Sequence, residues 1–330
     1  MLRGIVVGAG TMGLVHAQHY RDNSQVTLVG IVDTNEEAGL RLAQAMGVPW
    51  YAHMEAVPET LNFCDVNTPT PMHVPLARQA MQLGMDVILE KPVARSHDEA
   101  WQLGQLANTL GRSLLVGHVL RFFPQYEKAR QLCVAGEVGR VGMVHMTRGG
   151  RSPVGFNHWY ADPKLSGGLI LDMIIHDFDW LRWTFGEVEH VFAQSTPVGP
   201  EQYALVTLRL ASGVIAHVEG SWAHDRNFAS SLEVAGSEGV LHFDSTNVVP
   251  LWQEGVSDEQ RMGVAIPESP AHMSPYDREL AHFVDVLQHG GEPRVQFADA
   301  LAAMDIAFAA MKSAKIGEPV YLEEVRRQEV

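Results

Sequence analysis

Residues 166–183, SGGLILDMIIHDFDWLRW, place acidic and basic side chains within an apolar segment. The spacing predicts one helix with apolar residues around most of its circumference, so the helix should be buried. Asp172, His176 and Asp179 fall on one narrow stripe of it. A carboxylate four residues from an imidazole can orient the ring and stabilise its charged form, as a general base requires. From this helix alone, Asp172 and His176 could equally be a structural pair that satisfies its own buried polar groups.

A metal site is the other chemistry that these residue types allow. Asp172, His176 and Asp179, with His158, offer ligands that suit zinc or iron. The chain has 16 histidines, however, so a chance cluster is unsurprising. We therefore predict no metal.

A glycine-rich turn after the first expected strand points to a dinucleotide. VVGAGTMG places Gly8, Gly10 and Gly13 in the G-x-G-x-x-G spacing. Gly8 permits a tight turn, Gly10 lets the backbone approach a pyrophosphate, and Gly13 lets the next helix pack on the sheet. The first turn of that helix, with Thr11 and Met12, would face the phosphates. A glycine turn in an unrelated α/β protein, or a methyltransferase, is the alternative.

The acidic residue expected downstream of such a turn is Asp33, at the end of the second expected strand. Its carboxylate would accept hydrogen bonds from the adenosine ribose hydroxyls and would repel a 2′-phosphate. Thr34 and Asn35 follow it and provide no cation for that phosphate. The sequence therefore favours NAD over NADP as cofactor.

Two segments follow strands whose carboxyl ends should meet at one edge of the sheet, where doubly wound folds bind ligands. In NTPTPMH, residues 67–73, Thr68 and Pro69 would shape a loop beneath the cofactor. His73 is interpreted as a structural residue of the following helix. LEKP, residues 89–92, comes from the next strand along the chain.

The dipeptide Glu90–Lys91 has two interpretations. A solvated ion pair is the commoner role of such a dipeptide. However, Lys91 follows a buried strand, and Pro92 makes its backbone rigid. The ammonium group of Lys91 should then point into the ligand cleft.

Together, GAGTMG, NTPTPMH, EKP and SGGLILDMIIHDFD resemble the glucose–fructose oxidoreductase/inositol dehydrogenase/MocA family across residues 5–186. The resemblance implies a Rossmann domain followed by an α/β domain with an open sheet, and NAD(P)-dependent oxidation of sugar or polyol hydroxyls. It implies that Lys91, Asp172 and His176 are catalytic and that Glu90 and Lys91 border the cofactor. It also implies a cis Lys91–Pro92 bond.

Substrate contacts are expected from two further segments. GHVLRFFPQY, residues 117–126, follows the last Rossmann strand, and FNHWYADP, residues 156–163, precedes the Asp172 segment. Many relatives have Trp-Arg where this chain has Trp159–Tyr160, so the sequence does not predict the substrate contact that this arginine would make and leaves the substrate open. Aromatic and polar mixtures suit a carbohydrate, although packing explains Trp159 nearly as well. The candidates are His118, Arg121, Phe122, Trp159 and Tyr160, with His224, Asp225 and Arg226 as weaker ones.

The elements that must position these residues fall into two domains. Short apolar runs alternate with helical patterns up to residue 117, which predicts a parallel sheet covered on both faces. Strand-like runs at 188–195, 203–210, 214–222, 230–236 and 239–243, separated by turn sequences such as ASGV and GSEG, predict a second sheet. The predicted fold is α/β: an N-terminal Rossmann doubly wound parallel sheet at 1–120, then a C-terminal α+β domain with a largely antiparallel open sheet at 121–330. Residues 253–274 are expected to form a loop.

Composition limits the class of protein. The 330 residues are 46% hydrophobic and 19% charged, which is typical of a globular chain. A net charge of −15 disfavours nucleic acid or an anionic membrane as partner. Two distant cysteines, no signal-peptide pattern and no long apolar run predict a cytoplasmic protein. An open sheet also predicts a homodimer or homotetramer.

These observations predict an NAD-dependent dehydrogenase that acts on a secondary hydroxyl of a sugar or an inositol-like polyol. His176 would take the hydroxyl proton, Asp172 would orient it, and Lys91 would stabilise the reacting oxygen. One alternative is an NAD-dependent glycosidase that uses transient oxidation. Another is a non-catalytic NAD(H)-binding regulator.

Overall fold

The computed structural model describes the chain apart from residues 154–158, 161, 199–200, 224–227, 248–272 and 328–330. Contacts divide it into two compact units. Unit 1 comprises Met1–Phe122 and Ser269–Leu301, and unit 2 comprises Phe123–Glu268 and Ala302–Val330. The domain boundary expected at residue 120 lies close to Phe122, where the chain first passes from unit 1 to unit 2. The expected continuous domain at 121–330 is corrected, because the segment up to Leu301 returns to unit 1.

Unit 1 is built on a six-stranded parallel sheet in the order β3-β2-β1-β4-β5-β6, which confirms the Rossmann prediction. The β-branched runs form strands because both faces of the sheet are covered, so almost every side chain of β1, β2, β4 and β5 is buried or half-buried. The two-residue edge strand β3 was too short to predict. The strands are β1 (Leu2–Val7), β2 (Val26–Val32), β3 (Trp50–Tyr51), β4 (Phe63–Val66), β5 (Asp86–Glu90) and β6 (Leu114–Gly117).

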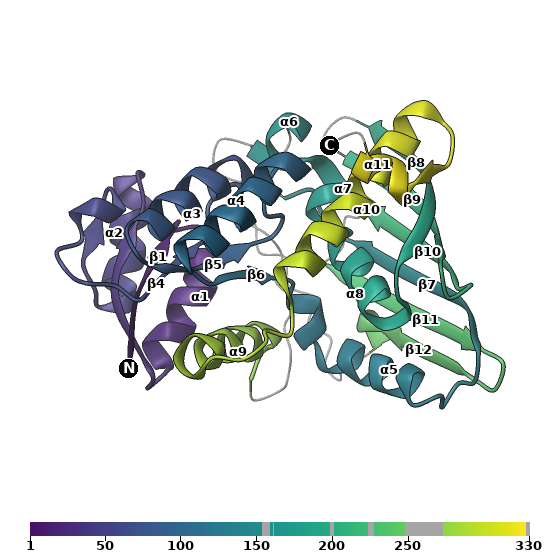
Figure 1. Cartoon of the computed structure of the whole chain (residues 1–330), viewed down its shortest axis with the longest axis horizontal. Helices are drawn as coiled ribbons and strands as arrows, with labels where there is room; N and C mark the ends of the chain where they lie inside the picture. Colours follow the sequence, from purple (N-terminus) through teal and green to yellow (C-terminus); the bar gives the residue numbers. More distant parts are fainter. Residues whose placement is uncertain (154–158, 161, 199–200, 224–227, 248–272, 328–330) are drawn as a thin grey trace, which may run out of the picture. The chain divides into compact units, whose positions relative to one another are not determined.

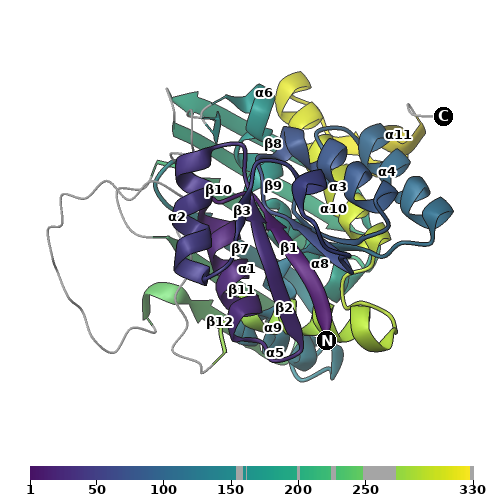
Figure 2. The ribbon, with the colours of Figure 1, turned by 90° about the vertical axis from the view of Figure 1, so that its left-hand side faces the viewer.

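Helices cover both faces of this sheet: Figure 2 shows α1 and α2 on one side of β1 and β2, and α3 and α4 on the other. Capping side chains mark several starts: Asn35 accepts the Ala38 N–H at α2, and Ser96 accepts the Glu99 N–H at α4. The helices are α1 (Thr11–Asp22), α2 (Glu36–Met46), α3 (His73–Gln82), α4 (His97–Leu110) and α9 (Pro275–His289), with short 3₁₀ turns η1 (Met54–Ala56), η2 (Thr70–Met72) and η3 (Val119–Phe122).

Helix α9 joins unit 1 through its apolar face. Leu280, Phe283 and Val284 are buried in the same core cluster as Tyr20 of α1 and Phe63 of β4. A capping box between Ser274 and Asp277 fixes the start of this helix. Because this burial is shared with α1, the packing assigns α9 to the first unit despite its distance along the chain.

Unit 2 contains a seven-stranded sheet in the order β12-β11-β7-β10-β9-β8-β13. Strands β7 and β10 pair in parallel and the other neighbours pair antiparallel, which confirms the largely antiparallel prediction. The strands are β7 (Val141–Gly149), β8 (Val188–Val198), β9 (Glu201–Leu210), β10 (Ile215–Ser221), β11 (Ala229–Gly236), β12 (Val240–Asp244) and β13 (Val320–Tyr321), with a 3₁₀ turn η5 (Ser245–Asn247).

One face of this sheet carries the unit 2 core. Figure 1 shows α5, α8 and α10 beside that face. On the opposite face, Tyr203, Leu205 and Ile215 remain exposed. The alternation of buried and exposed residues along β9 and β10 is typical of a sheet covered on one side. The helices are α5 (Pro124–Val134), α6 (Pro163–Ser166), α7 (Gly168–Asp172), α8 (Ile175–Phe185), α10 (Phe297–Ile316), which starts in unit 1, and α11 (Leu322–Arg327).

The single helix expected at 166–183 is corrected to two helices. Helix α7 ends at Asp172 and α8 begins at Ile175. Tertiary packing explains the break, because Ile174 is fully buried and sits so close to β10 that a side chain on Gly220 would collide with it. The apolar residues are buried as predicted. The Ile174 N–H bonds to the Leu169 carbonyl, five residues back, so the turn between Asp172 and Ile175 is wider than a regular helical turn.

None of the described helices is long and apolar enough to cross a membrane.

Candidate active site

The glycine loop between β1 and α1 requires two of its glycines for packing. Gly8 has φ 103°, and a Cβ there would lie 2.5 Å from the Asn67 carbonyl oxygen. A Cβ on Gly13 would overlap the Gly8 carbonyl oxygen. These two positions therefore fix the tight turn and the close seating of α1, as the sequence predicted.

Gly10 differs because the space beside it is open. No described atom lies within 4 Å of a Cβ placed there. Gly10 is also the N-cap of α1 and makes no side-chain cap, and the N–H groups of the first turn, at Thr11, Met12 and Gly13, lack an intrahelical acceptor. Thr68, in the neighbouring loop, has a buried Oγ1 without a hydrogen-bond partner in the described part of the chain. An open backbone surface with unsatisfied polar atoms fits a dinucleotide phosphate.

Asp33 follows β2 with its carboxylate already oriented. Oδ2 accepts the Ala9 N–H at 2.6 Å, and Oδ1 accepts the Asn35 N–H at 2.7 Å. The indole N–H of Trp50 donates to the Asp33 carbonyl at 2.9 Å. Each carboxylate oxygen keeps a lone pair, so Asp33 can still accept hydrogen bonds from a ribose diol.

His73 joins the two sheet-edge loops. Its Nδ1 lies 2.7 Å from the Pro92 carbonyl oxygen, and its Nε2 lies 2.8 Å from the Thr68 carbonyl oxygen. Burial lowers the pKa of His73 despite these carbonyl contacts. The contacts agree with a structural role, and half-buried Thr68 and exposed Pro69 form the loop between β4 and α3. The Lys91–Pro92 peptide is cis, which confirms the prediction.

Strand β5 ends at Glu90 and Lys91 follows it, and both residues are half-buried. Glu90 Oε2 accepts the Lys91 backbone N–H at 3.1 Å, and Glu90 Oε1 lies 3.5 Å from His16 Nε2. Although burial opposes ionisation of Glu90, His16 and Lys91 outweigh it and lower the pKa of this carboxyl group. Glu90 is therefore an anion held in the core rather than one half of a solvated pair.

The sequence analysis missed a buried polar cluster next to this strand end. His16 of α1 and Asp65 of β4 are 1% and 0% exposed, and His16 Nδ1 lies 2.8 Å from Asp65 Oδ2. The same carboxylate accepts hydrogen bonds from the Tyr20 hydroxyl and the Asn67 amide. A signal was present, because a carboxylate inside the apolar run FCDV must find a buried partner.

In unit 2, Asp172 is the last residue of α7 and His176 is the second residue of α8. Asp172 is buried and His176 is half-buried, which leaves the imidazole partly accessible. Asp179, on the next turn of α8, is 1% exposed. The neighbouring Asp177 forms a bidentate pair with Arg148 of β7, both N–O distances being 2.8 Å, and this pair holds α8 to the sheet.

The expected substrate residues Arg121 and Phe122 make contacts within unit 1 that account for their burial. Arg121 is 1% exposed and donates to the Arg294 carbonyl at 2.7 Å and to Asp299 Oδ2 at 3.0 Å. Phe122 packs on Phe283, and the Arg294 guanidinium lies 4.6 Å from its ring centre. Both side chains therefore link η3 to the returning segment of unit 1. His118 is buried nearby, after β6.

Trp159 and Tyr160 stack on each other, with ring centres 3.9 Å apart and planes tilted by 33°. Both are half-buried, so an aromatic surface remains partly exposed before α6. The weaker candidates His224, Asp225 and Arg226, His158 of the metal interpretation, and most of the expected loop at 253–274 lie outside the described residues. Among the described residues there is no group of three or more His, Cys, Asp or Glu that could hold a metal ion.

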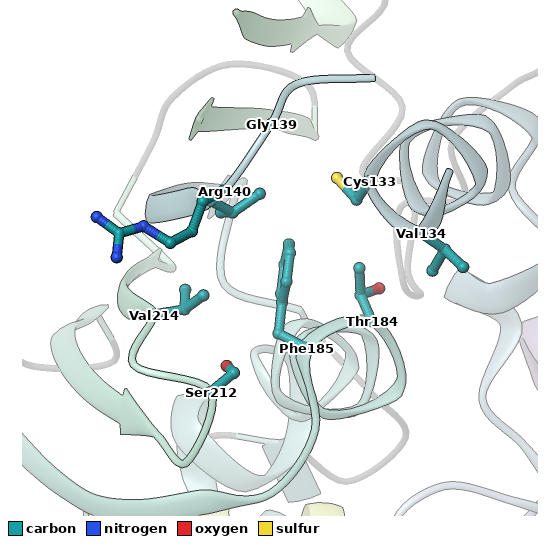
Figure 3. A pocket seen from close by; sticks show the side chains of 9 residues that line it. Cys133, Val134, Gly139, Arg140, Thr184, Phe185, Ser212 and Val214 are labelled. Atoms are coloured by element: carbon teal, nitrogen blue, oxygen red, sulfur yellow. The ribbon is translucent and has the colours of Figure 1, made fainter. Parts of the chain in front are cut away.

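A cavity of about 280 Å³ in unit 2 does not offer the expected chemistry. Figure 3 shows Phe185 and Val214 facing each other across it, with the Arg140 guanidinium extending away. Its remaining polar atoms come from Cys133, Thr184 and Ser212, and burial raises the pKa of the Cys133 thiol. This lining lacks a carboxylate–imidazole pair, so it does not replace the residues described above.

Comparison with known proteins gives consistent matches. The family model described as "Oxidoreductase family, NAD-binding Rossmann fold" matches residues 2–118, and the model "GFO/IDH/MocA C-terminal domain" matches residues 126–242.

Similar full-length proteins include an inositol 2-dehydrogenase from Rhizobium meliloti, 28% identical over 93% of this chain and 95% of that protein. A myo-inositol 2-dehydrogenase from Thermotoga maritima is 26% identical over 97% of this chain and 98% of its own length. The crystal structure of GenD2 from gentamicin A biosynthesis in complex with NAD is 27% identical and covers 97% of this chain and 96% of its own, with a TM-score of 0.86.

Proposed function

This chain belongs to the GFO/IDH/MocA oxidoreductase family, and we propose that it is an NAD-dependent dehydrogenase of a secondary hydroxyl in a cyclic polyol or sugar. The observation that carries the proposal is the edge of the unit 1 sheet. The open backbone at Gly10, the oriented carboxylate of Asp33 and the side chain of Lys91 follow the carboxyl ends of β1, β2 and β5. Doubly wound sheets bind dinucleotides at this edge.

The cofactor contacts follow from the donors and acceptors of unit 1. The first turn of α1, with Thr11, Met12 and Gly13, would bind the pyrophosphate, and Asp33 would accept the ribose hydroxyls. Thr68 and Pro69 would border the nicotinamide half, with Glu90 and Lys91 at the adjacent strand end. NAD, when bound, supplies the hydride acceptor that this chain's own side chains lack.

The proton and charge transfers are assigned to three residues. His176, partly accessible, takes the proton from the substrate hydroxyl at one of its ring nitrogens. The carboxylate of Asp172 stabilises the ring once it is charged. The Lys91 ammonium group donates a hydrogen bond to the substrate oxygen, where negative charge develops as the C–H bond breaks.

The substrate class rests on the relatives and on the aromatic pair. The relatives named as inositol dehydrogenases act on hydroxyls of a six-membered polyol ring. The stacked Trp159–Tyr160 pair provides an apolar surface of the kind that packs against the C–H face of such a ring. His118 remains a candidate substrate contact. We also propose that the protein is a homo-oligomer and, because Cys64 and Cys133 are both free, that it works in the reducing cytoplasm.

The test is a screen of inositols, pentoses, hexoses and sugar acids with NAD, followed by NADH absorbance. The proposal expects stoichiometric NADH with at least one of these compounds. Release of a glycoside's leaving group without NADH accumulation would favour the glycosidase alternative. Cofactor binding without turnover on any compound would favour the regulator.

Two variants then test the assigned roles on the substrate that the screen identifies. Lys91→Ala should lower kcat by about 10²-fold or more, the effect of losing one oxyanion donor. His176→Ala should lower kcat by about 10²- to 10⁴-fold. We expect wild-type oxidation to become faster as pH rises, because a general base must be unprotonated, and His176→Ala should lack this dependence. Lys128→Ala, which removes an exposed lysine from α5, is the matched control. Near wild-type kcat in folded Lys91→Ala or His176→Ala would contradict the assignment.

A further inference from the structure

A continuous chain of polar contacts runs from the core of unit 1 to the backbone of Lys91. Asp65 Oδ2 lies 2.8 Å from His16 Nδ1. The other ring nitrogen of His16 lies 3.5 Å from Glu90 Oε1, which is an ion-pair contact and not an aligned hydrogen bond. Glu90 Oε2 then accepts the Lys91 N–H at 3.1 Å. None of the reaction steps assigned above uses His16 or Asp65.

The inner end of this chain is fixed. Asp65 lies on the central strand β4 and is fully buried. The Tyr20 hydroxyl donates to its Oδ2 at 2.7 Å, and the Asn67 amide donates to its Oδ1 at 2.8 Å. With the His16 contact added, three side chains hold this carboxylate, so it can set the orientation of the imidazole ring.

The charge of His16 explains how one ring can serve two carboxylates. Burial opposes a charged ring, but the adjacent Asp65 and Glu90 outweigh burial and raise the pKa of His16 from 6.5 to about 10. At neutral pH both ring nitrogens therefore carry protons, and each faces a carboxylate oxygen. Without this cation, two buried anions would face each other across the same space.

The other neighbour of Lys91 is fixed as well. The carbonyl oxygen of Pro92 lies 2.7 Å from Nδ1 of the buried His73. The Lys91 N–H is thus held by the Glu90 carboxylate, and the carbonyl of the next residue, Pro92, contacts the buried His73 ring. The Lys91 side chain has four rotatable carbon–carbon bonds, so its ammonium group can be placed reproducibly only from a fixed backbone.

We propose that His16 is a positioning residue for Lys91, because it holds the Glu90 carboxylate in the orientation that fixes the Lys91 peptide. The kinetic part of this inference rests on the proposed dehydrogenase function. The structural part concerns only unit 1 and is testable without a substrate.

The experiment compares His16→Asn with His19→Gln. Asparagine can keep the contact to Asp65 but is too short to reach Glu90. His19 is the matched control, because it lies on the same helix and pairs with Asp277 at 3.0 Å, away from Glu90. Hydrogen exchange of the Lys91 amide is measured for both variants and wild type, together with kcat and the KM for NAD. Thermal unfolding checks that each variant is folded.

We expect the Lys91 amide to exchange faster in His16→Asn, because its acceptor is no longer held. We also expect kcat to fall by about tenfold or more while the KM for NAD changes little, since small misplacements of catalytic groups cost up to about 10²-fold. His19→Gln should change neither. If His16→Asn does not fold, Glu90→Gln replaces it in the same measurements, because it removes the negative charge that pairs with His16.

Unchanged exchange in a folded His16→Asn protein would overturn the proposal, as would faster exchange with unchanged kcat. If the screen finds no oxidisable substrate, the proposed dehydrogenase fails on its own. The exchange measurement then still decides whether His16 fixes the Lys91 peptide.

Discussion

Asp33 illustrates how one side chain can set cofactor preference. Its carboxylate is held by the N–H groups of Ala9 and Asn35, so it cannot easily turn away from a 2′-phosphate. We expect wild type to prefer NAD over NADP by at least about tenfold in kcat/KM, or about 1.4 kcal/mol. Asp33→Ala should narrow this ratio. Steady-state kinetics with NAD and with NADP measure this ratio of kcat/KM. The control is Asp22→Ala, which removes an exposed carboxylate at the end of α1. A wild-type preference for NADP would contradict the argument.

His16 predicts how stability changes with pH. Its pKa is about 10 in the folded protein, where the neighbouring carboxylates outweigh burial, and 6.5 is its ordinary value. The folded state therefore binds more protons than the unfolded state between these values. The stability that His16 contributes is fully present below about pH 6.5 and is lost as pH rises towards 10, at up to about 1.4 kcal/mol per pH unit.

Urea unfolding of wild type and His16→Asn at intervals from pH 6 to pH 10 measures this effect. The difference in unfolding free energy between the two proteins should shrink as pH rises. A difference that stays constant across this range would mean that His16 has no raised pKa.

Single residues were predictable where a local pattern carries the information. Gly8, Gly13 and Asp33 lie where the glycine spacing placed them, because turn geometry and strand length fix such positions. Arg121 was assigned to substrate because it follows a strand end. Its partner is the carbonyl of Arg294, 173 residues away, and nothing local reveals that contact. The ion pair of His16 and Asp65 was missed for the same reason.

At the scale of elements, two glycines of the loop between β1 and α1 have different roles: Gly10 serves cofactor binding and Gly13 serves folding. Gly10→Ala adds a methyl group to open space, so the protein should fold normally. That methyl would occupy the place where the backbone approaches the pyrophosphate, and we expect NAD affinity to fall by about tenfold or more. Gly13→Ala should instead destabilise the fold by roughly 1–3 kcal/mol, because the added atom overlaps the Gly8 carbonyl.

Calorimetry and thermal unfolding of the two variants provide the comparison. Wild-type NAD affinity in Gly10→Ala would mean that the pyrophosphate lies elsewhere. Normal stability in Gly13→Ala would mean that α1 can shift without cost.

Element boundaries were predictable where turn sequences separate the apolar runs: β10 and β11 begin and end within one residue of the expected 214–222 and 230–236. The segment at 166–183 shows the limit of this approach. Its apolar residues fit one helix, and each residue is buried as that helix requires. The break after Asp172 comes from Ile174 packing close to Gly220 of β10. Helical periodicity does not include contacts with a residue 46 positions later in the sequence, so it cannot reveal the break.

At the scale of the whole molecule, the order of the two sheets followed from strand spacing, but the division of the chain did not. Helix α9 follows β12 of the second sheet in sequence and packs against α1 of the first unit. Its amphipathic pattern predicts a buried face without saying which core receives that face. A single domain boundary near residue 120 therefore described where the chain leaves unit 1, but it missed the later segment that ends at Leu301 and belongs to unit 1 again.

The open face of the unit 2 sheet carries the last prediction. Tyr203, Leu205 and Ile215 are 42%, 46% and 39% exposed on adjacent strands of that face. Tyr203 and Leu205 are neighbours on this face, and Ile215 lies beyond the Thr207–His217 pair. Exposed apolar side chains on an uncovered sheet face commonly mark a protein interface. We expect light scattering at micromolar concentration to give a mass that is a multiple of the 36.4 kDa chain.

Leu205→Arg tests which surface forms the contact. Leu205 lies directly opposite Glu219 of β10, so the arginine can pair across the strands and leave the fold intact. The same arginine would place a charge inside an interface on this face, and the variant should therefore have the mass of a single chain. Leu83→Arg, which changes an exposed leucine of unit 1, is the matched control and should assemble as wild type does. A wild-type mass of 36.4 kDa would contradict assembly altogether, and an assembled Leu205→Arg protein would place the interface on another surface.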